Sequence, residues 1–489
     1  MKNPNVMAIV ALCCGTLITG CVVGPDYQRP DVEVPKEWRI DYSAASDLTN
    51  AKWWQQFNDP VLDRLVETAL KENLDIRIAA SRIDQFLGQL NTTRAEFFPE
   101  LGGGGGVSRN RISEEAFGSA PGNDPYYTQY EAALGASWQL DLFGRVQRQT
   151  ESVQAQVYAS EQGRRGVILS VVTGVTSSYV ALRGLDRQRE IARETERNYK
   201  RSVDIFKLRH SYGTVSQLEV DQVESQYQLA AAAVPLLEAQ IAAQENLISI
   251  LLGRHPGELI RGKTLDEMTL VGIPESLPAS LLTRRPDIQQ AEQNLISANA
   301  NIGVAESLYY PDISITGTFG QASADLGDLL DSSARIWDLG ASITAPIFTF
   351  GRIEGQIQSA EAVRQQAEDR YRFTILSALK EVNDSLVSTA KTSQNFQALT
   401  KRVSALRSYA KLADMRFENG AASYLEVLYA NNELFQAELD TVSSQIEHYS
   451  SLINVYKSMG GGWVDQAAGM AEPIADTSAK AITVMPQLR

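Results

Sequence analysis

Histidine and cysteine are scarce in this chain of 489 residues, with three of each. The histidines lie far apart without a neighbour at metal-ligand spacing, so we interpret them as surface or packing residues. They are His210, His255 and His448. Cys13, Cys14 and Cys21 all lie near the N-terminus. The rest of the sequence therefore offers no disulfide framework and no thiol for catalysis.

An excess of basic charge is also absent. The chain has 45 basic and 59 acidic residues, which gives a net charge of -14 and argues against nucleic-acid binding. The sequence contains no Gly-x-Ser-x-Gly motif and no zinc-spaced histidine pair. We therefore expect neither catalysis nor a bound metal or cofactor.

Long apolar runs are also missing. After the N-terminal segment, no apolar run approaches the roughly 18 to 20 residues that a membrane-spanning helix requires. Residues 1–20 combine Lys2, an apolar stretch and Gly20, which predicts a cleaved signal peptide. The stretch "ITGC" resembles a bacterial lipobox, which implies cleavage before Cys21 and acylation (palmitate among the expected chains) of Cys21. Residues 21–60 would then be an extended, lipid-anchored segment. An ordinary signal peptide with an incidental cysteine is the alternative.

The sequence is rich in internal similarity. "RHSYGTVSQLEV" (209–220) matches "RFENGAASYLEV" (416–427) at a spacing of 207 residues. "DIRIAASRI" from Asp75 matches "DIQQAEQNL" from Asp287 at a spacing of 212. These offsets predict two tandem repeats, 61–252 and 287–459, joined by a linker over 253–286.

Each repeat contains a segment of strict apolar–polar alternation. In the first repeat, Tyr130 to Leu140 carry apolar residues at even positions, and in the second, Trp337 to Ile347 carry them at odd positions. Alternation over about ten residues with aromatic residues on the apolar side is typical of transmembrane strands. We predict β-hairpins over about 99–142 and 311–349. Gly102–Gly106 fits a strand better than a phosphate loop, since no Lys-Ser/Thr helix start follows.

A helical period follows each predicted β-hairpin. Residues 145–209 and 352–416 contain no proline. We predict long helical hairpins over 145–252 and 352–459, with the repeated glycine turns at their far ends. Pro235 should kink or break the first returning helix. A long solvated coiled coil remains the alternative for these segments.

Four strands per chain cannot close a barrel, because the smallest bacterial outer-membrane barrels use eight. An open sheet would leave unpaired backbone groups in lipid. If the strands span a membrane, several copies of the chain must share one barrel.

At this point the sequence resembles a known family. The stretches that carry the likeness are "CVVGPDYQRPDVEVPKEW", "WWQQFNDPVLDRLVETALKENLDIRIAASRI", "LLTRRPDIQQAEQNLISANANIGVAESLYYPDISITGTFG" and "YKSMGGGW". They are similar to TolC-like outer-membrane efflux lipoproteins, of the NodT/OprM type that serves resistance-nodulation-division pumps. The resemblance implies a mainly α fold with transmembrane β-structure. In it, a homotrimer builds a 12-stranded outer-membrane barrel and a periplasmic α-barrel, with a mixed equatorial domain from 253–286 and the tail 460–489.

The resemblance also implies a function. The chain would be a passive exit duct in the outer membrane, supplied by a periplasmic adaptor and an inner-membrane pump, and would export drugs or other small toxic compounds. The same fold serving metal-cation efflux or type I secretion is the alternative. A remote alternative is a structural lipoprotein that transports nothing.

The family's functional residues transfer to the two hairpin tips. Gly213 and Gly420 match the turn glycines at the tips, where adaptor hairpins dock. The gate candidates are Glu219, Glu426, Tyr429, Arg209 and Arg416. The two arginines are expected as basic partners of the acids, or else as solvated helix-end charges. Tyr429 replaces an acid that rings the closed pore in several relatives, so we expect an aromatic constriction there or the participation of Glu433.

Overall fold

The structure is a computed structural model that describes residues 22–35, 38, 52–113, 125–269, 272–273, 278–460 and 463–464. Cys21 and nearly all of the predicted tail lie outside the described residues. The chain divides into two compact units. The first comprises Met1–Asp31, Ile83–Ala159 and Ala291–Tyr371, and the second comprises Val32–Arg82, Ser160–Gln290 and Arg372–Arg489.

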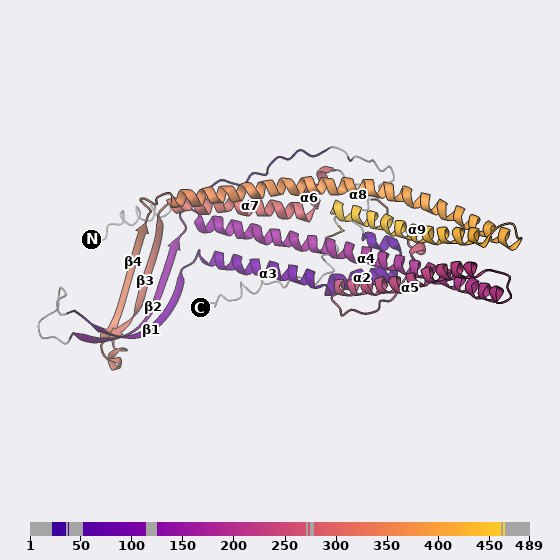
Figure 1. Ribbon diagram of the computed structural model, residues 1–489. Helices are drawn as coiled ribbons and strands as arrows, with labels where there is room; N and C mark the ends of the chain where they lie inside the picture. The colour runs from indigo at the N-terminus through magenta and orange to yellow at the C-terminus, as the bar shows by residue number, and fades with distance from the viewer. Residues whose placement is uncertain are drawn as a thin grey trace. The chain divides into compact units, whose positions relative to one another are not determined.

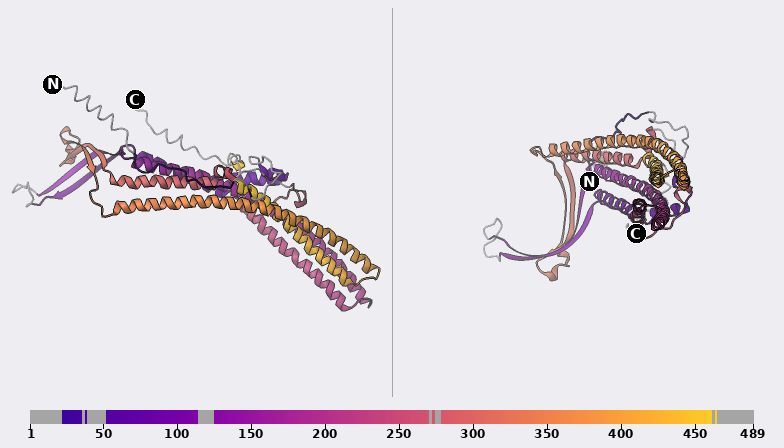
Figure 2. Two further views of the ribbon diagram at one scale, coloured as in Figure 1. Left: turned by 90° about the horizontal axis from the view of Figure 1, so that it is seen from above. Right: turned by 45° about the vertical axis from the view of Figure 1, so that its right-hand side comes forward.

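The first unit contains one antiparallel sheet of four described strands in the order β1-β2-β3-β4 (Figure 1). Its strands are β1 (Glu100–Arg111), β2 (Tyr126–Leu140), β3 (Asp312–Ser323) and β4 (Arg335–Thr344). Each repeat contributes one hairpin, and the pairing of β2 with β3 joins the two repeats. The strands are strongly bent (Figure 2).

The alternating sequence pattern explains these strands. On the odd-numbered face of β4, Trp337 is 73% exposed and Leu339 is 75% exposed, so this apolar face has no cover in the single chain. β4 ends at Thr344, although the alternation continues to Ile347. The expectation of strand over the last three residues was therefore wrong for the isolated chain, in which no neighbouring strand is available to them.

A pair of helices precedes each β-hairpin. These are α2 (Pro60–Glu72) and α3 (Leu74–Ala95) in the first repeat, and α6 (Leu281–Arg284) and α7 (Pro286–Glu306) in the second. Asn73 separates α2 from α3, because its side-chain oxygen accepts from the backbone N–H of Ile76 at 3.0 Å. Its amide nitrogen donates to the carbonyl of Leu251 at 2.8 Å. The segment before the first β-hairpin therefore forms two helices.

Two long helical hairpins follow the β-hairpins (Figure 1). They are formed by α4 (Arg145–Ser211) with α5 (Gln217–Leu251), and by α8 (Arg352–Glu418) with α9 (Tyr424–Met459). Pro235 lies inside α5, which continues through it, so of the expected kink or break the break does not occur. Leu237 and Ile241, two and six residues later, are buried in the core of the second unit, and this packing offsets the lost backbone hydrogen bond.

One window of α4 is apolar enough, by length and composition alone, to cross a membrane. The expectation that no such stretch follows the N-terminus was too strong. More than half of that window, 56%, is buried inside the protein. Ile168, Val172, Val175 and Tyr179 of α4 are all fully buried in the core of the second unit. Burial among other helices accounts for the hydrophobicity without a lipid contact.

The core of the second unit is rich in tryptophan. It includes Trp53 from the short helix η1 (Trp53–Phe57), together with Tyr456 near the end of the second repeat and Trp463 just after it. The rings of Trp53 and Tyr456 are stacked with centroids 4.9 Å apart, and Trp463 meets Trp53 edge-on at 6.0 Å. Segments from both ends of the described chain thereby share one core. The other short 3-10 helices are Leu265–Glu267, Pro278–Ser280, Ser307–Tyr309, Leu326–Asp328 and Ser332–Ala334.

The segment after Cys21 lies along the first unit. The backbone N–H of Val23 donates to the carbonyl of Phe143 at 3.2 Å, directly after β2. Arg148 of α4 donates to the carbonyls of Val23 and Gly24, each at 3.0 Å, and pairs with Asp26 at 2.9 Å. These bonds fix residues 22–26 beside the junction between a strand and a helix.

Candidate functional site

The two helical hairpins end in turns of the same geometry. Gly213 and Gly420 both have φ +70°, a conformation that residues with a Cβ resist. In the first turn, the N–H of Thr214 donates to the carbonyl of Arg209 at 3.0 Å. In the second, the N–H of Ala421 donates to the carbonyl of Arg416 at 2.8 Å. This six-to-one bond over a left-handed glycine is the Schellman motif that ends a helix.

Glu219 lies at the start of α5, where it closes a capping box. Its carboxylate accepts from the backbone N–H of Ser216 at 2.7 Å, and the Ser216 hydroxyl accepts from the N–H of Glu219 at 3.4 Å. The backbone and side-chain bonds from Ser216 hold the pKa of Glu219 below its ordinary value. The pattern Ser-x-x-Glu was visible in the sequence and is the signal that would have predicted this role.

The basic residues of the two turns make different contacts. Arg416 donates to the Glu426 carboxylate at 2.9 Å, so the second hairpin contains the pair that the sequence suggested. Arg209 instead lies over the rings of Phe206 and Phe417, with its guanidinium carbon 5.9 Å from each centroid. Within the described part of the chain, Arg209 and Glu219 form no ion pair.

An aromatic cluster joins the two hairpins near their tips. Phe206 of α4 lies 4.2 Å from Tyr424 of α9 and 6.4 Å from Phe417 of α8, measured between ring centroids. Phe206 is 2% exposed. We call Phe206, Phe417 and Tyr424 the tip cluster. Sequence reasoning missed it, although all three residues lie within seven positions of a turn glycine.

Tyr429 and Glu433 both lie on α9, one turn apart. Tyr429 is 59% exposed in the single chain. Glu433 accepts from Arg402 of α8 at 2.9 Å. Tyr429 thus presents an exposed ring at this level of α9, whereas the carboxylate of Glu433 is engaged within its own hairpin.

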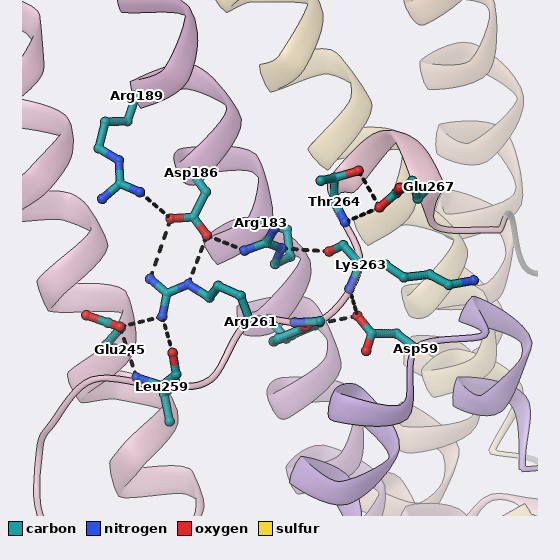
Figure 3. Close-up of polar contacts among 12 residues, drawn as sticks. Asp59, Arg183, Asp186, Arg189, Glu245, Leu259, Arg261, Lys263, Thr264 and Glu267 are labelled. Atoms are coloured by element: carbon teal, nitrogen blue, oxygen red, sulfur yellow. Dashed lines mark hydrogen bonds and ion pairs between the residues drawn. The ribbon is translucent and has the colours of Figure 1, made fainter. Parts of the chain in front are cut away.

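A buried carboxylate organises the segment that joins the repeats (Figure 3). Asp59 is fully buried and caps the start of α2 by accepting from the N–H of Val61 at 2.8 Å. It also accepts from the Tyr179 hydroxyl at 2.8 Å and from the N–H of Lys263 at 2.9 Å. Burial and the bond to Asp59 raise the pKa of Tyr179. A side chain at Gly262 would collide with Asp59, so this close approach requires glycine.

An ionic network continues from there (Figure 3). Arg261 lies between Asp186 of α4, which accepts at 3.0 Å, and Glu245 of α5. Arg183 pairs with Asp186 and donates to the carbonyl of Lys263 at 2.8 Å. These contacts bind the predicted linker 253–286 to the first helical hairpin and pair the charge of Arg261 within the protein, which is typical of a structural anchor.

Metal-binding groups of three or more histidine, cysteine or acidic residues are absent from the residues that the structure describes. His448 is buried between α8 and α9, where its Nδ1 lies 3.2 Å from the Thr392 hydroxyl. Burial lowers the pKa of His448. We interpret it as a packing residue, as the sequence suggested.

Comparison with known proteins connects this geometry to a family. The family described as "Outer membrane efflux protein" matches residues 65–254 and 277–461. A toluene efflux pump outer membrane protein, TtgC of Pseudomonas putida, is 32% identical over 468 residues, which are 94% of this chain and 96% of that protein. A probable outer membrane lipoprotein, SilC of Salmonella typhimurium, is 31% identical over 92% of this chain and 97% of its own.

A solved structure gives the same answer for the fold. The outer membrane channel MtrE of Neisseria gonorrhoeae, in its open state, aligns with a TM-score of 0.81 at 28% identity. The alignment covers 91% of this chain and 99% of that one. The two segments matched by the family description correspond to the two repeats, each with its β-hairpin and its helical hairpin.

Proposed function

Because the chain belongs to the outer membrane efflux protein family and so acts as an exit duct in the outer membrane, we propose that three copies assemble into one conduit. The observation that carries this proposal is the sheet. Its four described strands leave both outer edges unpaired, and its odd-numbered β4 face exposes tryptophan and leucine. Such a sheet is stable in lipid only when further copies close it.

The proposed partners of the homotrimer are a periplasmic adaptor and an inner-membrane resistance-nodulation-division pump. The two glycine turns, Gly213 and Gly420, have the same backbone geometry and exposed positions, which suits docking by a repeated adaptor element. The duct itself would perform no catalysis, since transport energy comes from the pump.

The proposed substrates are drugs, solvents or other small toxic compounds. The toluene pump component TtgC supports this choice, since its likeness spans nearly the whole of both chains. Metal-cation efflux and type I secretion use the same fold and are the competing assignments. A deletion strain distinguishes these three assignments. Its susceptibility to solvents, antibiotics and metal salts would be measured, together with the proteins that it secretes into the medium.

We propose Cys21 as the lipid attachment site. The next residues are bonded to Phe143 at the end of β2, so a lipid on Cys21 would be close to the end of the transmembrane strands. The lipoprotein SilC supports an anchor of this kind. Intact-mass spectrometry of the purified protein should show the added mass of the acyl chains. The Cys21→Ser variant should lack this added mass.

We propose that Tyr429 forms an aromatic constriction in the closed duct, because the neighbouring acid Glu433 is engaged by Arg402. Conductance in planar bilayers tests both the duct and its gate. The purified protein should conduct, and divalent cations should block it only weakly. Strong micromolar block that Glu433→Gln abolishes and Tyr429→Ala leaves intact would contradict an aromatic constriction alone. A trimer that never conducts, even with gate variants, would overturn the duct.

A further inference from the structure

A cavity of about 440 Å³ lies between the two helical hairpins of one chain. It is lined by α4 of the first hairpin and by α8 and α9 of the second (Figure 1). Its lining residues on α4 recur at spacings of three and four, for example Ile191, Glu194 and Asn198, so one face of the helix is turned toward the cavity. All of the lining residues belong to the second compact unit.

The floor of the cavity is apolar. Ile191, Tyr199, Val427 and Phe435 line it, and each is at most 6% exposed. A volume of this size with a buried apolar floor is typical of sites for small organic molecules. The hydroxyl of Tyr199 is buried without a hydrogen-bond partner among the residues that the structure describes. Buried hydroxyls are normally partnered, which leaves one polar group beside the floor for an occupant to satisfy.

Both basic side chains that line the cavity are already neutralised. Arg407 of α8 donates to the carboxylate of Glu438 at 2.8 Å. Arg187 of α4 pairs with Glu190 at 2.6 Å. Neither guanidinium is therefore free to neutralise a further acid in the cavity.

Two carboxylates that line the cavity are left over. They belong to Glu194 of α4 and Asp414 of α8, are exposed, and form no ion pair or hydrogen bond with any described residue. Desolvation by its surroundings, followed by the charge of Glu418, raises the pKa of Asp414, as expected for a carboxylate without a cation beside it. The cavity therefore combines an apolar floor with uncompensated negative charge.

We infer that this cavity binds a small organic cation with a flat apolar body, and that the bound cation holds the two hairpins together. The charged head would lie between Glu194 and Asp414, where amidinium or ammonium N–H groups make charge-assisted hydrogen bonds to carboxylates. The apolar body would cover the floor. Because one carboxylate comes from each hairpin, an occupied cavity favours the packed arrangement of the hairpins. This last effect rests on the proposed duct, in which the hairpins separate on opening.

An inorganic cation fits the cavity less well. Divalent ions in proteins are held by several oxygen ligands at once. Groups of three or more acidic, histidine or cysteine residues that could hold a metal ion are absent from the described chain, the cavity included. The apolar floor would also be left uncovered by a bare ion. Glu194 and Asp414 therefore suit a cation that brings its own apolar surface.

Three nearly isosteric probes test the charge that the cavity selects. Benzamidinium is a cation, benzamide is neutral and benzoate is an anion. Their binding to the purified full-length protein would be measured by isothermal titration calorimetry at low salt. Benzamidinium should bind at least about fourfold more tightly than benzamide, and benzoate should show no binding. Equal affinities for benzamidinium and benzamide would overturn the inference.

Two substitutions remove the carboxylates but keep their shape. Glu194→Gln and Asp414→Asn should each weaken benzamidinium binding about two- to fivefold, and together about four- to 25-fold. Asp204→Asn is the matched control, because Asp204 is an exposed acid of α4 that does not line the cavity. This control should leave the affinity unchanged. A double variant that binds like the wild type, or a control that weakens binding equally, would overturn the site.

Magnesium chloride distinguishes an organic from an inorganic cation site. At millimolar concentration it should weaken benzamidinium binding only as much as sodium chloride of the same ionic strength does. Displacement of benzamidinium by micromolar magnesium would identify a metal site and would overturn the inferred class of ligand.

Planar bilayers test whether the bound cation holds the hairpins together. Benzamidinium should lower the open probability of the channel, and benzamide should not. The effect should be lost in the double variant of Glu194 and Asp414. A reduction that persists in this variant would be a block of the pore and would overturn the coupling. A protein that binds benzamidinium but never conducts would overturn the duct, whereas a conducting channel that does not bind it would overturn this inference alone.

Discussion

The tip cluster, and not the ion pair beside it, should hold the two hairpins of one chain together. Arg416 and Glu426 belong to the same hairpin, and their side chains are 57% and 27% exposed. Such a pair contributes at most about 1 kcal/mol, and none of it joins the hairpins. Phe206 makes two ring contacts across the hairpins, with Tyr424 and Phe417. At about 0.5–1.5 kcal/mol each, they amount to about 1–3 kcal/mol.

The substitution Phe206→Leu isolates the contribution of these ring contacts. It keeps an apolar side chain in the buried position but removes the ring. A loss of about 1–3 kcal/mol increases the population of separated hairpins by roughly 5- to 150-fold. Open probability in planar bilayers should rise by a factor in that range, and hydrogen exchange near the tips should quicken accordingly.

Two matched variants complete this experiment. Arg416→Gln should raise open probability less than about fivefold, because the lost pair acts within one hairpin. Leu208→Ala changes an exposed residue of the same helix and should have no effect on opening. The reasoning is refuted if Arg416→Gln opens the channel as readily as Phe206→Leu, or if Phe206→Leu leaves both measurements unchanged.

Three further predictions concern stability. Gly213→Ala and Gly420→Ala should each cost about 1–2 kcal/mol in chemical unfolding, because both glycines have φ +70°; unequal costs would contradict the shared turn geometry. Asp59→Ala should lower the free energy of unfolding by about 4 kcal/mol or more, since a helix cap and two hydrogen bonds to a buried carboxylate are lost; tryptophan fluorescence in urea measures it. Burial lowers the pKa of His448, so the unfolded chain binds more protons below about pH 6.5 and stability should fall as pH drops through this range. In the His448→Gln variant, the melting temperature should depend less on pH in this range. An unchanged pH dependence would mean that other groups cause it.

Sequence patterns predicted the parts of this fold that are encoded locally. The period of two identified β2 and β4, and a helical period without proline identified α4 and α8. The repeat offsets predicted the matching turns at Gly213 and Gly420. The contact between Phe206 and Tyr424 had no such signal, because the two residues are 218 positions apart and come from hairpins with different sequences at these points.

Tertiary contacts account for local features that the sequence did not predict. Pro235 is tolerated because the following turns of α5 are held in the core. Asn73 ends α2 because its side chain bonds to the start of α3 and to Leu251. The role of Glu219 was readable from the Ser-x-x-Glu pattern, but its likeness to Glu426 suggested a partnership with Arg209 that the structure does not contain.

The pairing of β2 with β3 has a consequence for biogenesis. Leu140 meets Ile313, so strand β2 cannot complete its pairing until some 170 further residues have been made and exported. During that delay the first hairpin is exposed to other unfolded chains. Its outer strand carries Gly102–Gly106, and the segments that stack into amyloid-like aggregates contain few glycines. The glycine run would then protect the newly exported chain from aggregation until the second repeat arrives.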